Sequence, residues 1–155
     1  MAGRFRFRLE TVERVRGQEV ERQRRAVAVA TRAVKAAEAR LADVTNRLRD
    51  LALSTRSAKQ GGRLDVGLLR SQEFHGGWLA DQAIKAQGGL SVKKAELLRE
   101  RSLLGDLSKR LKVIEKLRER QWRRFRVEQA KREQVELDEV ALQQFVRSAP
   151  GESVV

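Results

Sequence analysis

The strongest constraint on the fold is a stripe of apolar residues between positions 27 and 51, repeated at alternating intervals of three and four residues. The stripe consists of Val27, Ala30, Val34, Ala37, Leu41, Val44, Leu48 and Leu51. Charged side chains occupy many of the positions between them, as in a helix that packs along one seam against a partner helix. The same frame continues more weakly towards the N-terminus. The pattern therefore predicts one long helix over about residues 9–53.

A second apolar series predicts a second long helix over about residues 66–146. Its members share one heptad frame: Leu69, Leu79, Ala83, Ala86, Leu90, Leu97, Leu104, Leu107, Leu111 and Ile114. The single proline, Pro150, follows this segment, and it marks a short tail at residues 147–155. Two glycine pairs, at 76–77 and 88–89, oppose the helix, because each glycine costs about 1 kcal/mol relative to alanine. Either the helix is loose there, or residues 61–90 form a small helical tip.

Small and polar residues separate the two series at positions 54–65, and Gly61-Gly62 favours a reversal of the chain there. Asp65 is a suitable N-cap for the second helix. We therefore expect an all-α fold, an antiparallel two-helix coiled-coil hairpin that forms one domain over residues 1–155. A parallel dimer of one continuous helix is disfavoured, because the glycines lie at the break in both series. The expected seam residues are Val27, Ala30, Val34, Ala37, Leu41, Val44, Leu48, Leu51, Leu97, Leu104, Leu107, Leu111 and Ile114.

The sequence offers no chemistry for catalysis. Cysteine is absent and His75 is the one histidine, so neither a thiolate site nor a histidine cluster can hold a metal. No glycine-rich phosphate-binding motif occurs. Ser71 lies four residues before His75, but a serine nucleophile also needs an orienting acid and a pocket that excludes water. We expect no enzyme activity, no catalytic or metal-binding residue and no cofactor.

The net charge of +13 concentrates at the expected end of the hairpin far from the turn. Residues 1–25 hold eight arginines and four glutamates, and residues 115–133 hold eight basic and four acidic side chains. Aromatic residues are interleaved with them: Phe5, Phe7, Trp122 and Phe125. This end is either a solvated charged face with helical ion pairs or a docking surface, since arginine and aromatic residues are enriched at protein interfaces.

Two other surfaces are compatible with this charge. A basic segment ahead of heptads is similar to a basic zipper that binds nucleic acid, but four glutamates interrupt the first 25 residues and the zipper leucines are missing. Phe5 and Phe7 among arginines could also lie weakly on an anionic membrane. The longest apolar run, Ala26–Ala30, is far shorter than the roughly 20 residues that span a bilayer. The charged N-terminus lacks the apolar region of a signal peptide, so we expect a cytoplasmic protein.

Two stretches resemble the FliJ family of flagellar export proteins. They are the run Phe5-x-Phe7-Arg8-Leu9-Glu10-x-Val12 and residues 118–141, with the sequence RERQWRRFRVEQAKREQVELDEVA. The length, the two-helix layout and the loop near residue 60 are also similar. The resemblance implies a soluble component of the bacterial flagellar type III export apparatus, and hence a role in motility and chemotaxis. It further implies a fold like the antiparallel coiled-coil stalk of rotary ATPases.

The resemblance also implies partners. These are the flagellar export ATPase, the cytoplasmic domain of the export gate and the export chaperones, with peripheral association at the inner face of the cell membrane. The ATPase-facing residues would be Phe7, Arg8, Leu9, Arg123, Arg124 and Phe125. The gate-facing residues would be Phe74, Trp78 and Leu79. The implied function is a stalk-like coupling and escort factor. The alternatives are the equivalent stalk protein of a non-flagellar type III secretion system and a basic coiled coil that binds nucleic acid.

Overall fold

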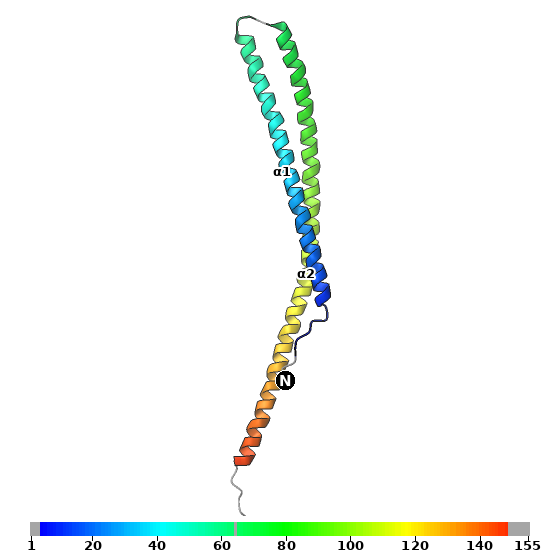
Figure 1. The fold of residues 1–155 in the computed structure, drawn as a ribbon, viewed down its shortest axis with the longest axis vertical. Coiled ribbons are helices and arrows are strands. Elements are labelled where there is room, and N and C mark those ends of the chain that lie inside the picture. The colour runs from blue at the N-terminus through cyan, green and yellow to red at the C-terminus, as the bar shows by residue number, and fades with distance from the viewer. Residues whose placement is uncertain (1–3, 64, 149–155) are drawn as a thin grey trace, which may run out of the picture. The chain divides into compact units, whose positions relative to one another are not determined.

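The structure, a computed structural model, describes residues 4–63 and 65–148. It contains two helices, α1 (Glu10–Gln60) and α2 (Val66–Ser148), and no strand among the described residues (Figure 1). The two helices pack against each other in opposite directions. This confirms the predicted all-α class and the helical hairpin.

The described residues fall into two compact units. The hairpin unit comprises residues 18–108 apart from residue 64, and the terminal unit comprises residues 4–17 and 109–148. Helix α2 is continuous through residue 108, so both units draw on it. Each unit has its own packing, and the core of the fold lies in the hairpin unit.

The core of the hairpin unit follows the two heptad series. Its central cluster consists of Val34, Leu90 and Leu97, with Val27, Ala30, Ala37 and Leu41 packed against it. Val20 and Leu79 are also buried. Of the expected seam residues, Val34 and Leu97 are buried and the others are half-buried. Two helices alone cannot enclose a seam from all sides, so partial burial is the normal outcome for most of its positions.

Helix α1 extends further than the sequence pattern indicates. It ends at Gln60, so the predicted end near residue 53 is wrong. The hydroxyl groups of Ser54 and Thr55 donate hydrogen bonds of 2.9 and 2.8 Å to the carbonyl oxygen of Leu51. Such bonds to the preceding turn satisfy the hydroxyl groups within the helix, so these small polar residues are compatible with it. The break comes at Gly62, whose φ of 74° is accessible to glycine at little cost.

Helix α2 begins with the predicted cap. The backbone N–H of Leu68 donates a 3.1 Å hydrogen bond to Oδ1 of Asp65, and the carboxylate thereby satisfies one of the N–H groups that have no partner within the helix. The backbone N–H of Leu69 donates to the carbonyl oxygen of the same aspartate at 3.1 Å. The start of α2 at Val66 therefore has a direct local cause.

The two glycine pairs do not interrupt α2, which is helical throughout residues 66–148. A small helical tip at residues 61–90 is therefore not formed. A Cβ atom placed on Gly77, Gly88 or Gly89 would meet nothing within 4 Å. Only at Gly76 would a Cβ touch the opposite helix, 3.5 Å from Cδ2 of Leu51. Close packing thus explains at most one of these four glycines.

Candidate functional site

The terminal unit closes with a cluster of three aromatic rings. Phe5, ahead of α1, lies with its ring centroid 5.2 Å from that of Trp122 and 5.5 Å from that of Phe125. Trp122 and Phe125 are stacked on α2 at 5.8 Å. Because these two residues are three positions apart, they share one face of the helix. We call Phe5, Trp122 and Phe125 the terminal aromatic cluster. It fixes the segment before α1 on α2.

The cluster is partly open to solvent and carries a cation. Trp122 is 43% exposed, and the guanidinium carbon of Arg126 lies 5.9 Å from the centroid of its ring. This is within the range of a cation–π contact. Phe7, in the same segment as Phe5, is only 5% exposed. The segment is therefore anchored by one buried and one partly exposed phenylalanine.

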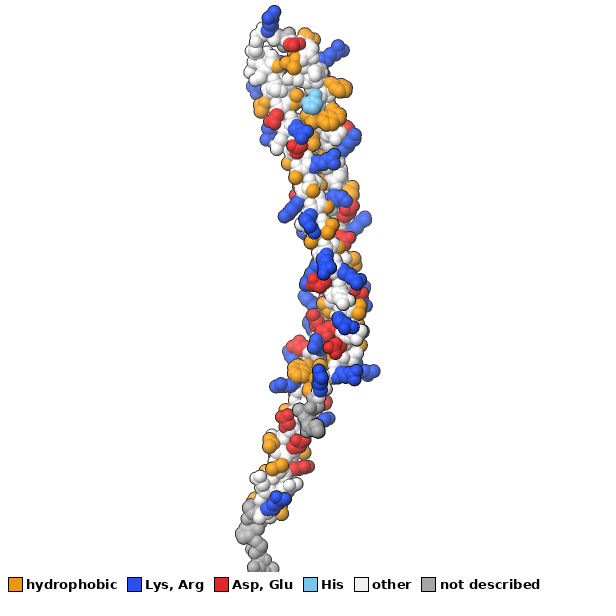
Figure 2. Space-filling view, viewed as in Figure 1, with side chains coloured by type: hydrophobic (Ala, Val, Ile, Leu, Met, Phe, Trp, Pro, Cys, Tyr) orange, Lys and Arg blue, Asp and Glu red, His pale blue; other side chains and the backbone are white. Residues whose placement is uncertain are grey.

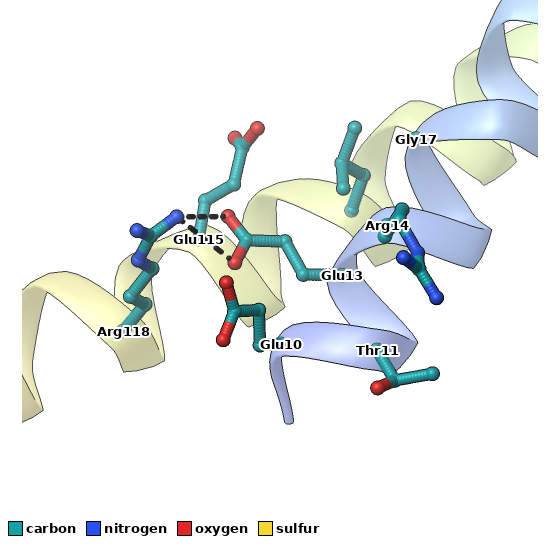
Figure 3. Close-up of a pocket in the computed structure, with 8 residues that line it drawn as sticks. Glu10, Thr11, Glu13, Arg14, Gly17, Glu115 and Arg118 are labelled. Atoms are coloured by element: carbon teal, nitrogen blue, oxygen red, sulfur yellow. Dashed lines mark hydrogen bonds and ion pairs between the residues drawn. The ribbon is translucent and has the colours of Figure 1, made fainter. Parts of the chain in front are cut away.

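A charged groove lies beside this anchor. Arg118 on α2 donates two hydrogen bonds of 3.2 Å to the two carboxylate oxygens of Glu13 on α1. Figure 3 shows both side chains pointing toward each other across the groove, with Glu10 and Glu115 next to them. Both bonds come from the same nitrogen, Nη1, so the contact is a charge-assisted bond between the two helices and not the fork in which two nitrogens each bind one oxygen. The ion pair thus holds the first turns of α1 against α2.

The groove itself is open, with a volume of about 570 Å³, and it is lined by Glu10, Thr11, Glu13, Arg14, Gly17, Leu111, Glu115 and Arg118. It has no histidine or serine that could act as a base or nucleophile. Among residues 4–63 and 65–148, no group of three or more His, Cys, Asp or Glu side chains could hold a metal ion. The charged side chains that line this groove are therefore suited to ionic contacts.

All six residues expected to face an ATPase lie in the terminal unit, but they differ in exposure. Arg8, Arg123 and Arg124 are exposed and Leu9 is 38% exposed. Arg123 pairs with Glu119, one turn earlier on α2. Phe7 is buried and Phe125 is half-buried in the terminal aromatic cluster. The arginines are thus available to a partner, whereas the two phenylalanines mainly hold the segment in place.

The three residues expected to face an export gate also differ in exposure. Phe74 is 83% exposed and Trp78 is 51% exposed, whereas Leu79 is 1% exposed and belongs to the seam. His75 stacks on Trp78 with ring centroids 5.8 Å apart. Figure 2 shows hydrophobic side chains gathered on the surface of the hairpin unit near the turn. Phe74 and Trp78 can therefore contact a partner directly, while Leu79 can only support them.

The apolar pattern did not reveal how many residues of α2 have no residue of α1 packed against them. Helix α1 has 51 residues and α2 has 83, and every residue from 130 to 147 is exposed. The signal was present in the unequal predicted lengths of the two helices, about residues 9–53 and 66–146. Within the terminal unit, the segment after the aromatic cluster has no residue of α1 opposite it.

Within the two described ranges of the chain, no helix is long and apolar enough to cross a membrane.

Comparison with known proteins gives one result. The family model described as Flagellar FliJ protein matches residues 5–150. Neither the curated proteins nor the solved structures contain a match. The matched range includes both helices and the terminal aromatic cluster, which is nearly the whole chain, and the protein therefore belongs to the FliJ family.

Proposed function

We propose that this protein is a non-enzymatic, stalk-like coupling and escort factor between the flagellar export ATPase, the export gate and the export chaperones. Its family implies a component of flagellar protein export that is not a catalyst. The observation that carries the finer proposal is the terminal unit, in which exposed arginines surround an aromatic cluster that is already ordered. A preformed surface of this kind loses little side-chain entropy on binding.

The ATPase contact would be made by Arg8, Arg123 and Arg124, with Leu9 adding apolar area. Guanidinium groups match carboxylates in a fork geometry, so an acidic ring lumen is the fitting counterpart. Basic charge at this end would also speed encounter with such a ring. An exposed arginine surface avoids the aggregation risk that a large apolar patch would bring to the free protein.

Phe7 and Phe125, the two phenylalanines expected to face the ATPase, would support the contact without touching the ATPase. Phe7 is buried, and Phe125 contacts Phe5 in the terminal aromatic cluster. Together they hold the segment that carries Arg8 against α2. Their loss would therefore disorder the surface rather than remove a direct contact.

The hairpin unit supplies stiffness. Residues 18–60 of α1 extend about 65 Å at a rise of about 1.5 Å per residue, and they pack along α2 through the central cluster around Val34. Two helices packed along a seam bend less readily than one. A rod of this kind can pass a displacement from a ring at one place to a partner at another.

The gate contact would use Phe74 and Trp78, which are exposed on α2. A large aromatic side chain that is exposed in the free protein is a common anchor of an interface. Contact with a membrane-embedded gate would place the protein peripherally at the inner face of the cell membrane. The chaperones are assigned no surface.

The proposal is tested by ATP hydrolysis by the purified flagellar export ATPase, titrated with this protein. We expect saturable stimulation that the double variant Arg123→Ala/Arg124→Ala loses. The matched control is Lys109→Ala/Arg110→Ala, a basic pair that is also exposed on α2, and it should stimulate like the unaltered protein. If both double variants lost the stimulation equally, the effect would depend on the net charge of the protein and not on Arg123 and Arg124. No stimulation and no co-elution with the ATPase would contradict the proposal, and stimulation of a non-flagellar secretion ATPase alone would assign the stalk role to that system.

A further inference from the structure

Within the terminal unit, the side of α2 that faces away from the start of α1 carries a row of basic side chains. The side toward α1 is marked by Phe125, which contacts Phe5, and by Arg118, which pairs with Glu13. At 3.6 residues per turn, the row lies on the opposite side of the helix, within about 120° of its circumference. All of its members are exposed. We call them the basic face: Lys109, Lys112, Lys116, Arg120, Arg123, Arg124 and Lys131.

No acidic side chain interrupts the basic face. The three acidic residues of the same stretch lie on its flanks, Glu115 and Glu119 on one side and Glu128 on the other. Asp106 precedes the row and Asp138 follows it. The charge on this side of α2 is therefore of one sign over residues 109–131.

Four members of the basic face follow one another at intervals of one helical turn: Lys112, Lys116, Arg120 and Arg124. Like charges at this spacing repel each other along a helix. In the ranges 4–63 and 65–148, none of these four forms an ion pair, whereas their neighbour Arg123 pairs with Glu119. The repulsion is thus not compensated within the described protein, and an anionic partner would relieve it.

We propose that the basic face binds the surface of an anionic lipid bilayer, with this part of α2 lying parallel to the membrane plane. From Lys109 to Lys131 the row extends about 33 Å, so it reaches several headgroups at once. Each lysine or arginine close to an anionic leaflet adds to the attraction. The long stems of these side chains let members spread around the helix reach one plane.

The apolar content of the basic face limits how deep the contact goes. The large apolar side chains exposed on it are Val113 and Val127, by 68% and 55%. Two valines are too few to insert into the acyl chains as a full amphipathic helix does. They are also too few to form a coiled-coil seam with an acidic helix. The contact is therefore mainly with the headgroups.

A nucleic acid is the other polyanion that such a row could meet. A helix in the major groove of a duplex is flanked by phosphates on both sides. Here the flanks carry Glu115, Glu119 and Glu128, which would repel those phosphates. A bilayer is flat, so it meets the basic face alone and leaves the glutamates in water. The arrangement of charges thus favours a membrane surface.

The first experiment is co-sedimentation of the full chain with vesicles of phosphatidylcholine and phosphatidylglycerol in equal parts. We expect binding that weakens as salt is added and that is lost on vesicles of phosphatidylcholine alone. The triple variant Lys112→Gln/Lys116→Gln/Arg120→Gln should weaken the partition coefficient at least about tenfold. It leaves Arg123 and Arg124 in place, because the lipid contact does not depend on the ATPase contact proposed for them. No binding to the anionic vesicles would overturn the proposal.

The matched control is Lys35→Gln/Arg49→Gln/Lys59→Gln, at three exposed basic positions of α1. It lowers the net charge by the same three units but leaves the basic face intact, so it should weaken binding less than about threefold. Equal weakening by the two triple variants would make net charge the cause and overturn the proposal. Circular dichroism should show both variants as helical as the unaltered chain, because glutamine favours a helix.

The same two variants distinguish a membrane from a nucleic acid. Binding to a DNA duplex at equal ionic strength should weaken to a similar extent in both, because it depends on the overall positive charge. If the variant of the basic face instead lost DNA binding more strongly than vesicle binding, the face would belong to a nucleic acid and the proposal would be overturned.

The orientation can be tested with the basic face intact, because the chain contains no native cysteine. A polarity-sensitive fluorophore is attached to Val127→Cys, on the basic face, or to Gln121→Cys, an exposed position about 120° around the helix. On anionic vesicles the emission of the label at position 127 should shift to shorter wavelength, and that of the label at position 121 should not. Equal shifts, or a shift at position 121 alone, would overturn the proposed orientation.

Discussion

The side chain of Gln23 on α1 donates a 3.1 Å hydrogen bond from Nε2 to the backbone carbonyl oxygen of Glu100 on α2. The same amide nitrogen contacts the carboxylate of Glu100. Gln23 is 9% exposed and is a buried polar residue in the seam of the hairpin unit. A buried polar contact among apolar seam residues favours one alignment of the two helices along each other.

Replacing Gln23 with alanine should therefore destabilise the hairpin unit. The variant loses a buried hydrogen bond and leaves a small void, so we expect a loss of about 1–2 kcal/mol in the free energy of unfolding. The measurement is urea denaturation followed by circular dichroism. Gln18→Ala, at an exposed position five residues earlier, is the control and should change stability by less than about 0.5 kcal/mol. Equal effects of the two substitutions would contradict a specific role for the contact.

The core of the hairpin unit provides a matched pair of leucines. Leu97 is 8% exposed and belongs to the central cluster, whereas its neighbour Leu98 is 66% exposed. Leu97→Ala should cost about 2–5 kcal/mol, because it removes buried apolar area and leaves a cavity. Leu98→Ala should stay within about 0.5 kcal/mol of the unaltered protein. Thermal unfolding by circular dichroism compares them, and similar melting temperatures for both variants would rule out the seam at this position.

The sequence was sufficient to predict the hairpin because both heptad series have apolar residues at regular spacing on either side of one glycine-rich break. The alternating pattern placed Val34 and Leu97 on the seam, where the structure buries them. It misplaced the end of α1, because small polar residues from Ser54 onward are typical of a loop, whereas here the Ser54 and Thr55 hydroxyl groups bond within the helix to the Leu51 carbonyl oxygen. Composition alone does not distinguish such helix-compatible polar residues from a loop.

The terminal unit was less predictable. The sequence indicated that Phe5, Trp122 and Phe125 would lie at the same end of the hairpin, but not that their rings would be in contact. That contact depends on a non-helical segment ahead of Glu10, whose path no periodicity encodes. Leu79 is a different case, because the family resemblance assigned it to one surface with Phe74 and Trp78, although its place in the second heptad series favoured the seam. The structure buries the leucine in the seam and leaves the two aromatic side chains outside.

Substitution by alanine should have opposite effects on stability at Gly77 in α2 and at Gly62 in the turn. Gly77→Ala should raise the free energy of unfolding by about 0.5–1 kcal/mol, because a Cβ there would meet nothing within 4 Å and alanine favours the helix. Gly62→Ala should lower it by about 1 kcal/mol, because the φ of 74° strains an alanine. Urea denaturation measures both. A destabilising effect of Gly77→Ala would show that this glycine is required for a conformation other than the continuous helix.

The terminal aromatic cluster can be tested by tryptophan fluorescence. The chain has two tryptophans, so the variant Trp78→Phe leaves Trp122 as the single reporter. In that background, Phe5→Ala should shift the emission of Trp122 to longer wavelength, because it removes the ring whose centroid lies 5.2 Å from the indole and admits water to that face. The helical circular dichroism signal should hardly change, since Phe5 precedes α1.

The control for this measurement is Phe74→Ala in the same background. Phe74 belongs to the hairpin unit and is 83% exposed, so its removal should leave the emission of Trp122 unchanged. A red shift with Phe5→Ala alone would establish that the segment ahead of α1, which carries Arg8, rests on α2 in solution. An unshifted emission would mean that the segment is detached, and the surface proposed for the ATPase would then be limited to the arginines of α2.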